Sequence, residues 1–293
     1  MAITASMVKE LREMTGAGMM DCKKALAETD GDMDAAVEVL RKSGAAKMEK
    51  KASRIAAEGI ARVATNGADA VVVEVNSETD FVAKNETFQE FVQVVADTAL
   101  ASGANGGANG EDVEAVLATN GLQELLVEKT ATIGEKLSFR RFEVVTKEDN
   151  QVFGTYSHMG GKIVTLALLE GSDEEVAKDV AMQIAAMKPQ YLDKESVPED
   201  RIEKERAILT EQAENEGLDP NKLPMIVNGR LNKFFEEVCL LDQGFVKENK
   251  MKVSKYVESK NSEIKCFVRF EVGEGMEKKE ENFAEEVAKQ MNA

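Results

Sequence analysis

The feature that most constrains the fold is a pattern of strand, turn, strand and helix that occurs twice in the chain. In the first copy, apolar runs at Ile60–Val63 and Ala70–Val75 flank Asn66-Gly67. Asn-Gly between such runs is the strongest short signal for a β-hairpin. A helical pattern follows from Thr87 to Leu100. This order predicts a β-β-α unit.

A second copy begins about ninety residues later. The runs Val152–Ser157 and Lys162–Leu169 flank Gly160-Gly161, and a helical pattern follows over Ser172–Met187. Two units of similar size predict a duplicated α+β core.

Two further strand-like runs, Leu137–Val145 and Ile264–Val272, could each complete one of the two sheets. The apolar phase of the first run slips at Arg140-Arg141, which predicts a β-bulge there.

Three short helices are predicted before the core. The first is capped by Thr4 or Ser6, the second spans Met20–Glu28, and the third runs from Met33 until Ser43-Gly44 closes it. Residues 1–54 carry 10 Lys and Arg against 9 Asp and Glu, whereas the remainder has a net charge of −18. This shift predicts a domain boundary near residue 54, with a linker that starts at residue 47.

All four prolines lie between residues 189 and 224, which marks a separate element inserted into the second unit. A helix is predicted over Glu199–Glu216 and a turn over Gly217–Pro220. The returning helix carries one apolar stripe: Leu223, Val227, Leu231, Phe234 and Val238. The insertion is therefore predicted to be a helical hairpin.

The formal net charge of the 293 residues is −17, which disfavours nucleic acid as the principal partner. No apolar stretch is long enough to span a membrane, and no signal peptide is recognisable. Folding signals begin almost at the first residue, so we expect a cytoplasmic protein.

Sequence motifs for catalysis are missing. His158 is the single histidine, and Cys22, Cys239 and Cys266 lie far apart, so no metal site is predicted. The segment Gly103–Gly110 follows no strand, and a flexible surface loop is expected there rather than a phosphate-binding loop. We expect no enzyme activity and no cofactor.

Two long segments carry a family resemblance. LREMTGAGMMDCKKAL at Leu11–Leu26 and EVNSETDFVAKN at Glu74–Asn85 resemble the signature motifs of bacterial translation elongation factor Ts. Three further parts of the chain occur in the same order as in that family: the segment that begins at Gly154, the inserted hairpin, and the segment that begins at Phe267. The resemblance covers essentially the whole chain.

The resemblance implies an α+β fold with five parts. They are a three-helix module similar to ubiquitin-associated domains, the two halves of the core, the antiparallel hairpin and a C-terminal helix. The three-helix module is expected over 1–54 and the first half of the core over 55–145. The second half of the core is expected over 146–188 and 239–275, with the hairpin over 189–238 inserted in it. The C-terminal helix is expected over 276–293.

The implied function is guanine-nucleotide exchange on elongation factor Tu, the GTPase that delivers aminoacyl-tRNA to the ribosome. The factor binds the GDP form, disturbs the magnesium and phosphate site, and releases GDP so that GTP can enter. Family members differ in self-association, so association through the core or the hairpin is left open.

Thr79, Asp80, Phe81 and Val82 are the segment that, by resemblance, intrudes beside the magnesium site of the partner. The alternative, from pattern alone, is that Asp80 caps a helical turn and Phe81 packs inward.

Resemblance also places Met19 and Met20 against the nucleotide domain of the partner, although core filling is an equal alternative for Met20. The turn with His158 and Gly160 is expected to contact the other domains of the partner.

Two other functions compete with nucleotide exchange. A general protein-binding adaptor would bind without releasing nucleotide. A hydrolase would use Asp80, His158 or Cys266, but these residues fall in different elements without a nucleophile motif.

Overall fold

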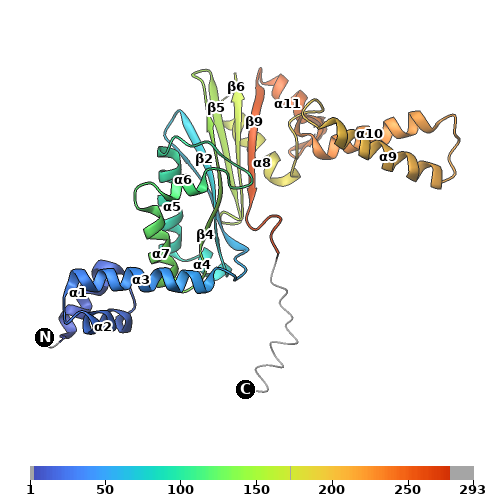
Figure 1. Ribbon diagram of the computed structural model, residues 1–293. Helices are drawn as coiled ribbons and strands as arrows, with labels where there is room; N and C mark the ends of the chain where they lie inside the picture. Colours follow the sequence, from blue (N-terminus) through green and yellow to red (C-terminus); the bar gives the residue numbers. More distant parts are fainter. Residues whose placement is uncertain (1–2, 172, 278–293) are drawn as a thin grey trace.

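The computed structural model describes residues 3–171 and 173–277. Two antiparallel sheets pack face to face and carry helices on their outer faces (Figure 1). A three-helix module lies at one end of the molecule, and a helical hairpin projects from the other. The fold is α+β, as predicted.

The first sheet has the strand order β1-β2-β4-β3. Its strands are β1 (Glu58–Thr65), β2 (Asp69–Ser77), β3 (Gly106–Gly107) and β4 (Ser138–Thr146). The helices of this half are α4 (Asp80–Ala83), α5 (Glu86–Ala101), α6 (Val113–Leu117) and α7 (Leu122–Ile133). Val71, Val73 and Val75 of β2 pack under α5 with Phe88 and Phe91, so alternate residues of the central strand form the core.

The bulge predicted in β4 is present. Glu74 pairs with Arg141, and the next residue, Val75, pairs with Phe139. Arg140 is therefore the extra residue.

The second sheet has the order β5-β6-β9. Its strands are β5 (Gln151–His158), β6 (Ile163–Glu170) and β9 (Glu263–Glu271), and α8 (Glu174–Met187) covers its outer face. The sequence did not predict the small elements that precede β9. They are η1 (Leu240–Asp242), β7 (Gly244–Phe245), β8 (Glu248–Lys252) and α11 (Val253–Ser259).

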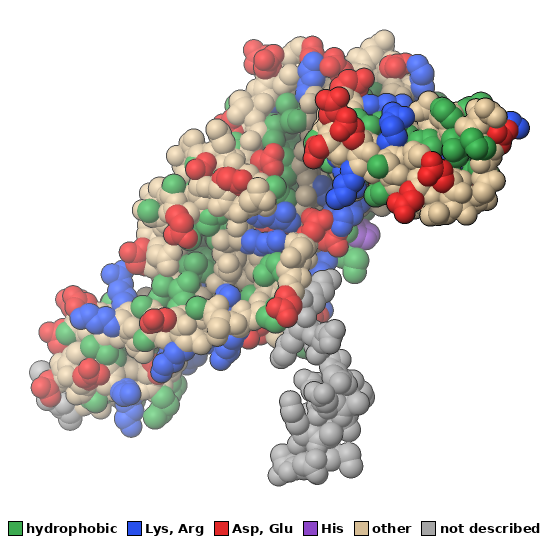
Figure 2. Space-filling model, turned by 45° about the vertical axis from the view of Figure 1, so that its right-hand side comes forward, with side chains coloured by type: hydrophobic (Ala, Val, Ile, Leu, Met, Phe, Trp, Pro, Cys, Tyr) green, Lys and Arg blue, Asp and Glu red, His purple; other side chains and the backbone are tan. Residues whose placement is uncertain are grey.

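A buried charged cluster joins the two sheets at one end of their apolar interface. Glu74 of β2 is fully buried and accepts hydrogen bonds from Arg141 Nε at 2.6 Å and Arg140 at 2.9 Å. It also accepts one from the backbone N–H of Gly273, just after β9, at 2.9 Å. On the surface beside the hairpin, Figure 2 shows further Lys, Arg, Asp and Glu side chains close together. The pairing compensates the burial of the Glu74 carboxylate, so the two sheets are held in one arrangement.

The N-terminal module consists of α1 (Ala5–Thr15), α2 (Met19–Glu28) and α3 (Met33–Lys51). Thr4 caps α1, as predicted. The prediction that Ser43-Gly44 ends the third helix is wrong, because α3 continues for seven residues beyond Gly44. A Cβ atom at Gly44 would lie 3.2 Å from Val127 of α7. The glycine therefore allows close packing of α3 on α7 instead of ending the helix.

The expectation of a flexible surface loop over Gly103–Gly110 is wrong at Gly106 and Gly107. Gly106 and Gly107 pair with Glu143 and Phe142 as the edge strand β3. Gly106 has φ +70°, and a Cβ atom there would lie 2.2 Å from the carbonyl oxygen of Phe142. Only glycine fits this strand position.

The predicted hairpin is confirmed as α9 (Glu199–Asn215) and α10 (Leu223–Val238). Val197, Leu231, Phe234, Phe235 and Val238 form a small core of its own, so the hairpin projects as a separate unit (Figure 1). The helix expected over 276–293 lies, from residue 278 on, outside the described residues. In the described part of the chain, no helix combines the length and apolar character needed to cross a membrane.

Candidate partner-binding site

The segment that follows β2 forms a short helix with an exposed phenylalanine. Thr79 is the N-cap of α4, and its Oγ1 accepts a hydrogen bond from the backbone N–H of Val82 at 3.4 Å. The alternative in which Asp80 caps this turn is therefore wrong. Thr79 has the extended backbone that an N-cap requires, whereas Asp80 is already the first helical residue.

Phe81 projects from α4 into solvent, and 80% of its surface is exposed. Inward packing of this ring is therefore also excluded. Val82 and Ala83, its neighbours in α4, pack against the core of the first sheet. The core thus holds one side of a single helical turn, while the opposite side presents an aromatic ring.

Asp80 lies beside Phe81 on the surface. Its carboxylate accepts a hydrogen bond from Lys84 Nζ at 2.7 Å, and this bond lowers the pKa of Asp80. The positive charge of Lys162, which directly precedes β6, acts in the same direction. The carboxylate therefore stays ionised near neutral pH and forms an exposed ion pair with Lys84.

The turn between β5 and β6 lies next to this segment. The backbone N–H of Ala61 in β1 donates to the carbonyl of Gly161 at 2.8 Å, and Lys162 pairs with Glu58. His158 and Gly160 are both exposed, and the ring of His158 stacks on Tyr156 with centroids 6.2 Å apart. The turn is therefore anchored on β1 while its tip faces solvent.

The sequence did not single out Met159, which lies between these two residues. It has φ +50° and is 75% exposed. An apolar residue flanked by two other candidates in one turn was a signal that could have identified it.

Met19 and Met20 start α2 and are 58% and 75% exposed. Core filling by Met20 is therefore excluded. Both line a groove of about 670 Å³ together with Ile3 and Val8, and Lys9, Arg12 and Lys23 form its basic rim. The groove combines adaptable apolar side chains with positive charge.

The hydrolase alternative receives no support from the geometry. Cys266 is half-buried in β9, and burial raises the pKa of its thiol, which disfavours a nucleophilic thiolate. Burial likewise raises the pKa of Cys22, which packs in the core of the N-terminal module. Within the described ranges, no three acidic, cysteine or histidine side chains are arranged to hold a metal ion.

A comparison with protein families identifies the family of this chain. The family described as Elongation factor TS matches residues 78–274. The chain belongs to the elongation factor Ts family. Factors of this family act in protein biosynthesis as nucleotide exchange factors for elongation factor Tu.

The elongation factor Ts match includes most of the residues described above. It begins at Glu78, so it contains Thr79–Val82, the turn with His158 and Gly160, and the hairpin. The N-terminal module with Met19 and Met20 lies before it. The sequence did not single out Glu78, or Glu135 and Lys136, which contact it from a loop more than fifty residues further along the chain.

Proposed function

We propose that this chain is a guanine-nucleotide exchange factor that binds elongation factor Tu with GDP, disturbs its magnesium and phosphate site, and promotes GDP release so that GTP can bind. The observation that carries the proposal is the exposed Phe81 on a helical turn whose other side packs on the core. This part of the chain also lies within the matched family segment.

Exchange requires no acid, base or nucleophile. It requires a stable complex with the empty GTPase and a strained complex that also holds nucleotide. By linkage, the factor weakens nucleotide binding by the same free energy by which nucleotide weakens factor binding. The proposed role of Phe81 is to generate this strain, and Asp80 places a negative charge beside it.

One wedge residue is insufficient for this task. Accelerating release by about a thousandfold requires roughly 4 kcal/mol of relative transition-state stabilisation. Burial of one phenylalanine supplies only about 1.5–3 kcal/mol. In our proposal, the remainder comes from docking surfaces that hold the wedge in place.

The docking surfaces are assigned to two other parts of the chain. The groove with Met19 and Met20 would bind the nucleotide domain of the partner, and the turn with His158 and Gly160 would bind its other domains. No cofactor is needed, the acidic net charge argues against direct nucleic-acid binding, and the proposed location is the cytoplasm. Self-association through the core or the hairpin is left open.

Stopped-flow release of a fluorescent GDP analogue from elongation factor Tu tests the proposal. We expect release to accelerate with factor concentration and then reach a plateau. Binding without acceleration would identify the chain as an adaptor and refute exchange.

A further inference from the structure

We infer that Glu135 is a positioning residue for exchange: its carboxylate, together with that of Glu78, fixes the backbone from which Phe81 projects. The inference rests on the proposed function and adds Glu135, which lies outside both sequence motifs, together with a supporting role for Glu78.

Glu135 lies in the loop after α7, directly behind the start of α4. Its Oε2 accepts hydrogen bonds from the backbone N–H groups of Glu78 and Thr79, both at 3.0 Å. Its Oε1 accepts one from Thr79 Oγ1 at 2.7 Å. One carboxylate thus binds three donors at the entry to α4. Hydrogen bonds to an ionised acceptor are stronger than neutral ones, so this entry is held in a single geometry.

The carboxylate of Glu78 likewise binds a backbone N–H group, in the loop that contains Glu135. Its Oε1 accepts a hydrogen bond from the backbone N–H of Lys136 at 2.6 Å. Each of the two glutamates therefore binds backbone of the loop that carries the other. We call this pair, Glu78 with Glu135, the carboxylate clasp.

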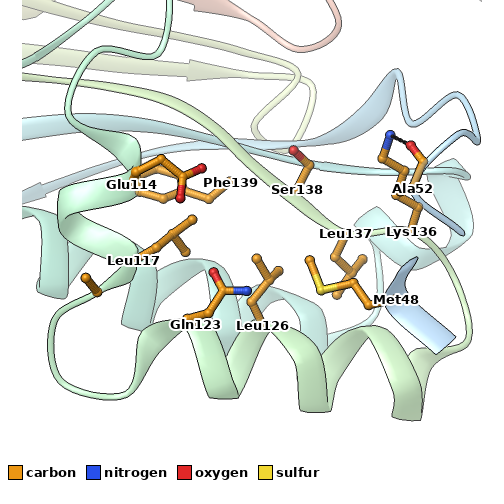
Figure 3. Close-up of a pocket in the computed structure, with 11 residues that line it drawn as sticks. Met48, Ala52, Glu114, Leu117, Gln123, Leu126, Lys136, Leu137, Ser138 and Phe139 are labelled. Carbon is orange, nitrogen blue, oxygen red and sulfur yellow. Dashed lines mark hydrogen bonds between the residues drawn. The ribbon is translucent and has the colours of Figure 1, made fainter. Parts of the chain in front are cut away.

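The carboxylate clasp is also connected to the end of α3. Arg54 pairs with Glu78 at 3.2 Å. Lys136 Nζ donates to the backbone carbonyls of Ala52 at 2.7 Å and Arg54 at 3.0 Å. Figure 3 shows the first of these bonds at the edge of a pocket that Met48 of α3 also lines. These contacts connect the segment that follows α3 to the carboxylate clasp, and through it to the segment that carries Phe81.

Phe81 needs such support because α4 has only four residues. An isolated helical turn is unstable, since nucleation fixes several dihedral angles for one hydrogen bond. The exposed ring gains no packing of its own, so its direction depends on the backbone. Val82 and Ala83 hold the far end of α4 on the core, and the carboxylate clasp holds the near end.

The test measures maximal GDP release and affinity for nucleotide-free elongation factor Tu with Glu135→Ala, Glu135→Gln and the control Glu124→Ala. Glu124 is an exposed glutamate on α7. We expect Glu135→Ala to slow maximal release about tenfold, because small misplacement of a positioned group has large kinetic effects. Affinity should change less. Glu135→Gln, which retains an acceptor oxygen, should recover most of the rate, and Glu124→Ala should match the parent.

The double variant Phe81→Ala/Glu135→Ala tests whether Glu135 affects GDP release through Phe81. If Glu135 acts through Phe81, the double variant should release GDP at the rate of Phe81→Ala alone. Additive losses would overturn the inference, because Glu135 would then act elsewhere.

Amide hydrogen exchange of the free variants gives a readout that is independent of the partner. Glu135→Ala should speed exchange at the amides of Glu78 and Thr79 while thermal unfolding of the whole protein stays cooperative. Parental protection of these amides would overturn the inference, as would a parental release rate. If the parent protein itself does not accelerate release, the proposed function fails first, and the inference fails with it.

Discussion

The two β-β-α units of the core share one scaffold but differ in their connections. In both, a β-hairpin is followed by a helix that covers the outer face of its sheet. In the first unit, residues 78–85 join β2 to α5 and include α4 with Phe81. In the second, only residues 171–173 separate β6 from α8, and the extra element, the hairpin of α9 and α10, follows α8 instead.

This difference shows that the sheets and helices form the buried scaffold, whereas the connections between them carry the exposed candidate contact residues. Both sheets bury their inner faces against each other through Val72, Leu166 and Phe270, and neither central strand exposes a candidate contact residue. The exposed apolar groups Phe81 and Met159 lie in connections instead. A rigid scaffold with variable connections is the usual way to place binding residues.

The largest effect on stability is expected from a substitution in the buried scaffold of the first unit. Phe88 of α5 is fully buried in the first core cluster. Phe88→Ala should lower the free energy of unfolding by about 3–5 kcal/mol through lost burial and a new cavity. Equilibrium unfolding in urea measures it. A loss similar to that of an exposed residue would contradict the assignment of Phe88 to the scaffold.

The connection seven residues earlier should behave in the opposite way. Phe81→Ala should leave unfolding close to parental, because the ring is exposed. If the ring is buried mainly in the transition state for release, its loss should raise the activation free energy by about 1.5–3 kcal/mol. The maximal rate of GDP release should then fall roughly ten- to over a hundredfold. Stopped-flow release at saturating factor is the measurement. Early melting with a parental release rate would make Phe81 structural and the wedge mechanism wrong.

The N-terminal module should contribute affinity and not the maximal rate. Met19→Asp places a charge in the apolar groove of α2 and should weaken binding about tenfold, which corresponds to about 1.4 kcal/mol. Titration of the release rate against factor concentration separates the half-saturating concentration from the plateau. A lower plateau with intact binding would show that the module takes part in nucleotide ejection.

A small effect on folding is expected when the hairpin that follows α8 in the second unit is removed. Residues 193–236 can be exchanged for a short glycine and serine linker that keeps Tyr191 and Leu192, whose carbonyls accept hydrogen bonds from Leu240 and Leu241. We expect the Tm of the core to fall by about 2–4 °C, because the hairpin has its own core. Exchange should persist in weakened form. Unfolding of the core in calorimetry would make the hairpin part of the scaffold.

Much of this architecture was readable from the sequence because its signals are local. The apolar runs on either side of Asn66-Gly67 predicted the first hairpin, the phase slip at Arg140-Arg141 predicted the bulge, and the proline cluster with one apolar stripe predicted α9 and α10. Each of these signals lies within one or two elements, where period and turn chemistry determine the backbone.

Tertiary contacts decided the rest. By its local pattern Gly44 ends a helix, but in the structure it lies inside α3 where α7 packs closely on it. By its local pattern Gly106 is a loop residue, but in the structure it pairs with β4. The carboxylate clasp joins Glu78 to a residue 57 positions away, so no local pattern can predict it. The sequence alone thus determined the main strands of the two sheets, the helices α5 and α8 that follow the two β-hairpins, and the order of the two units. The packing of distant segments determined which glycines are structural, which glutamates hold α4, and that Phe81 faces solvent.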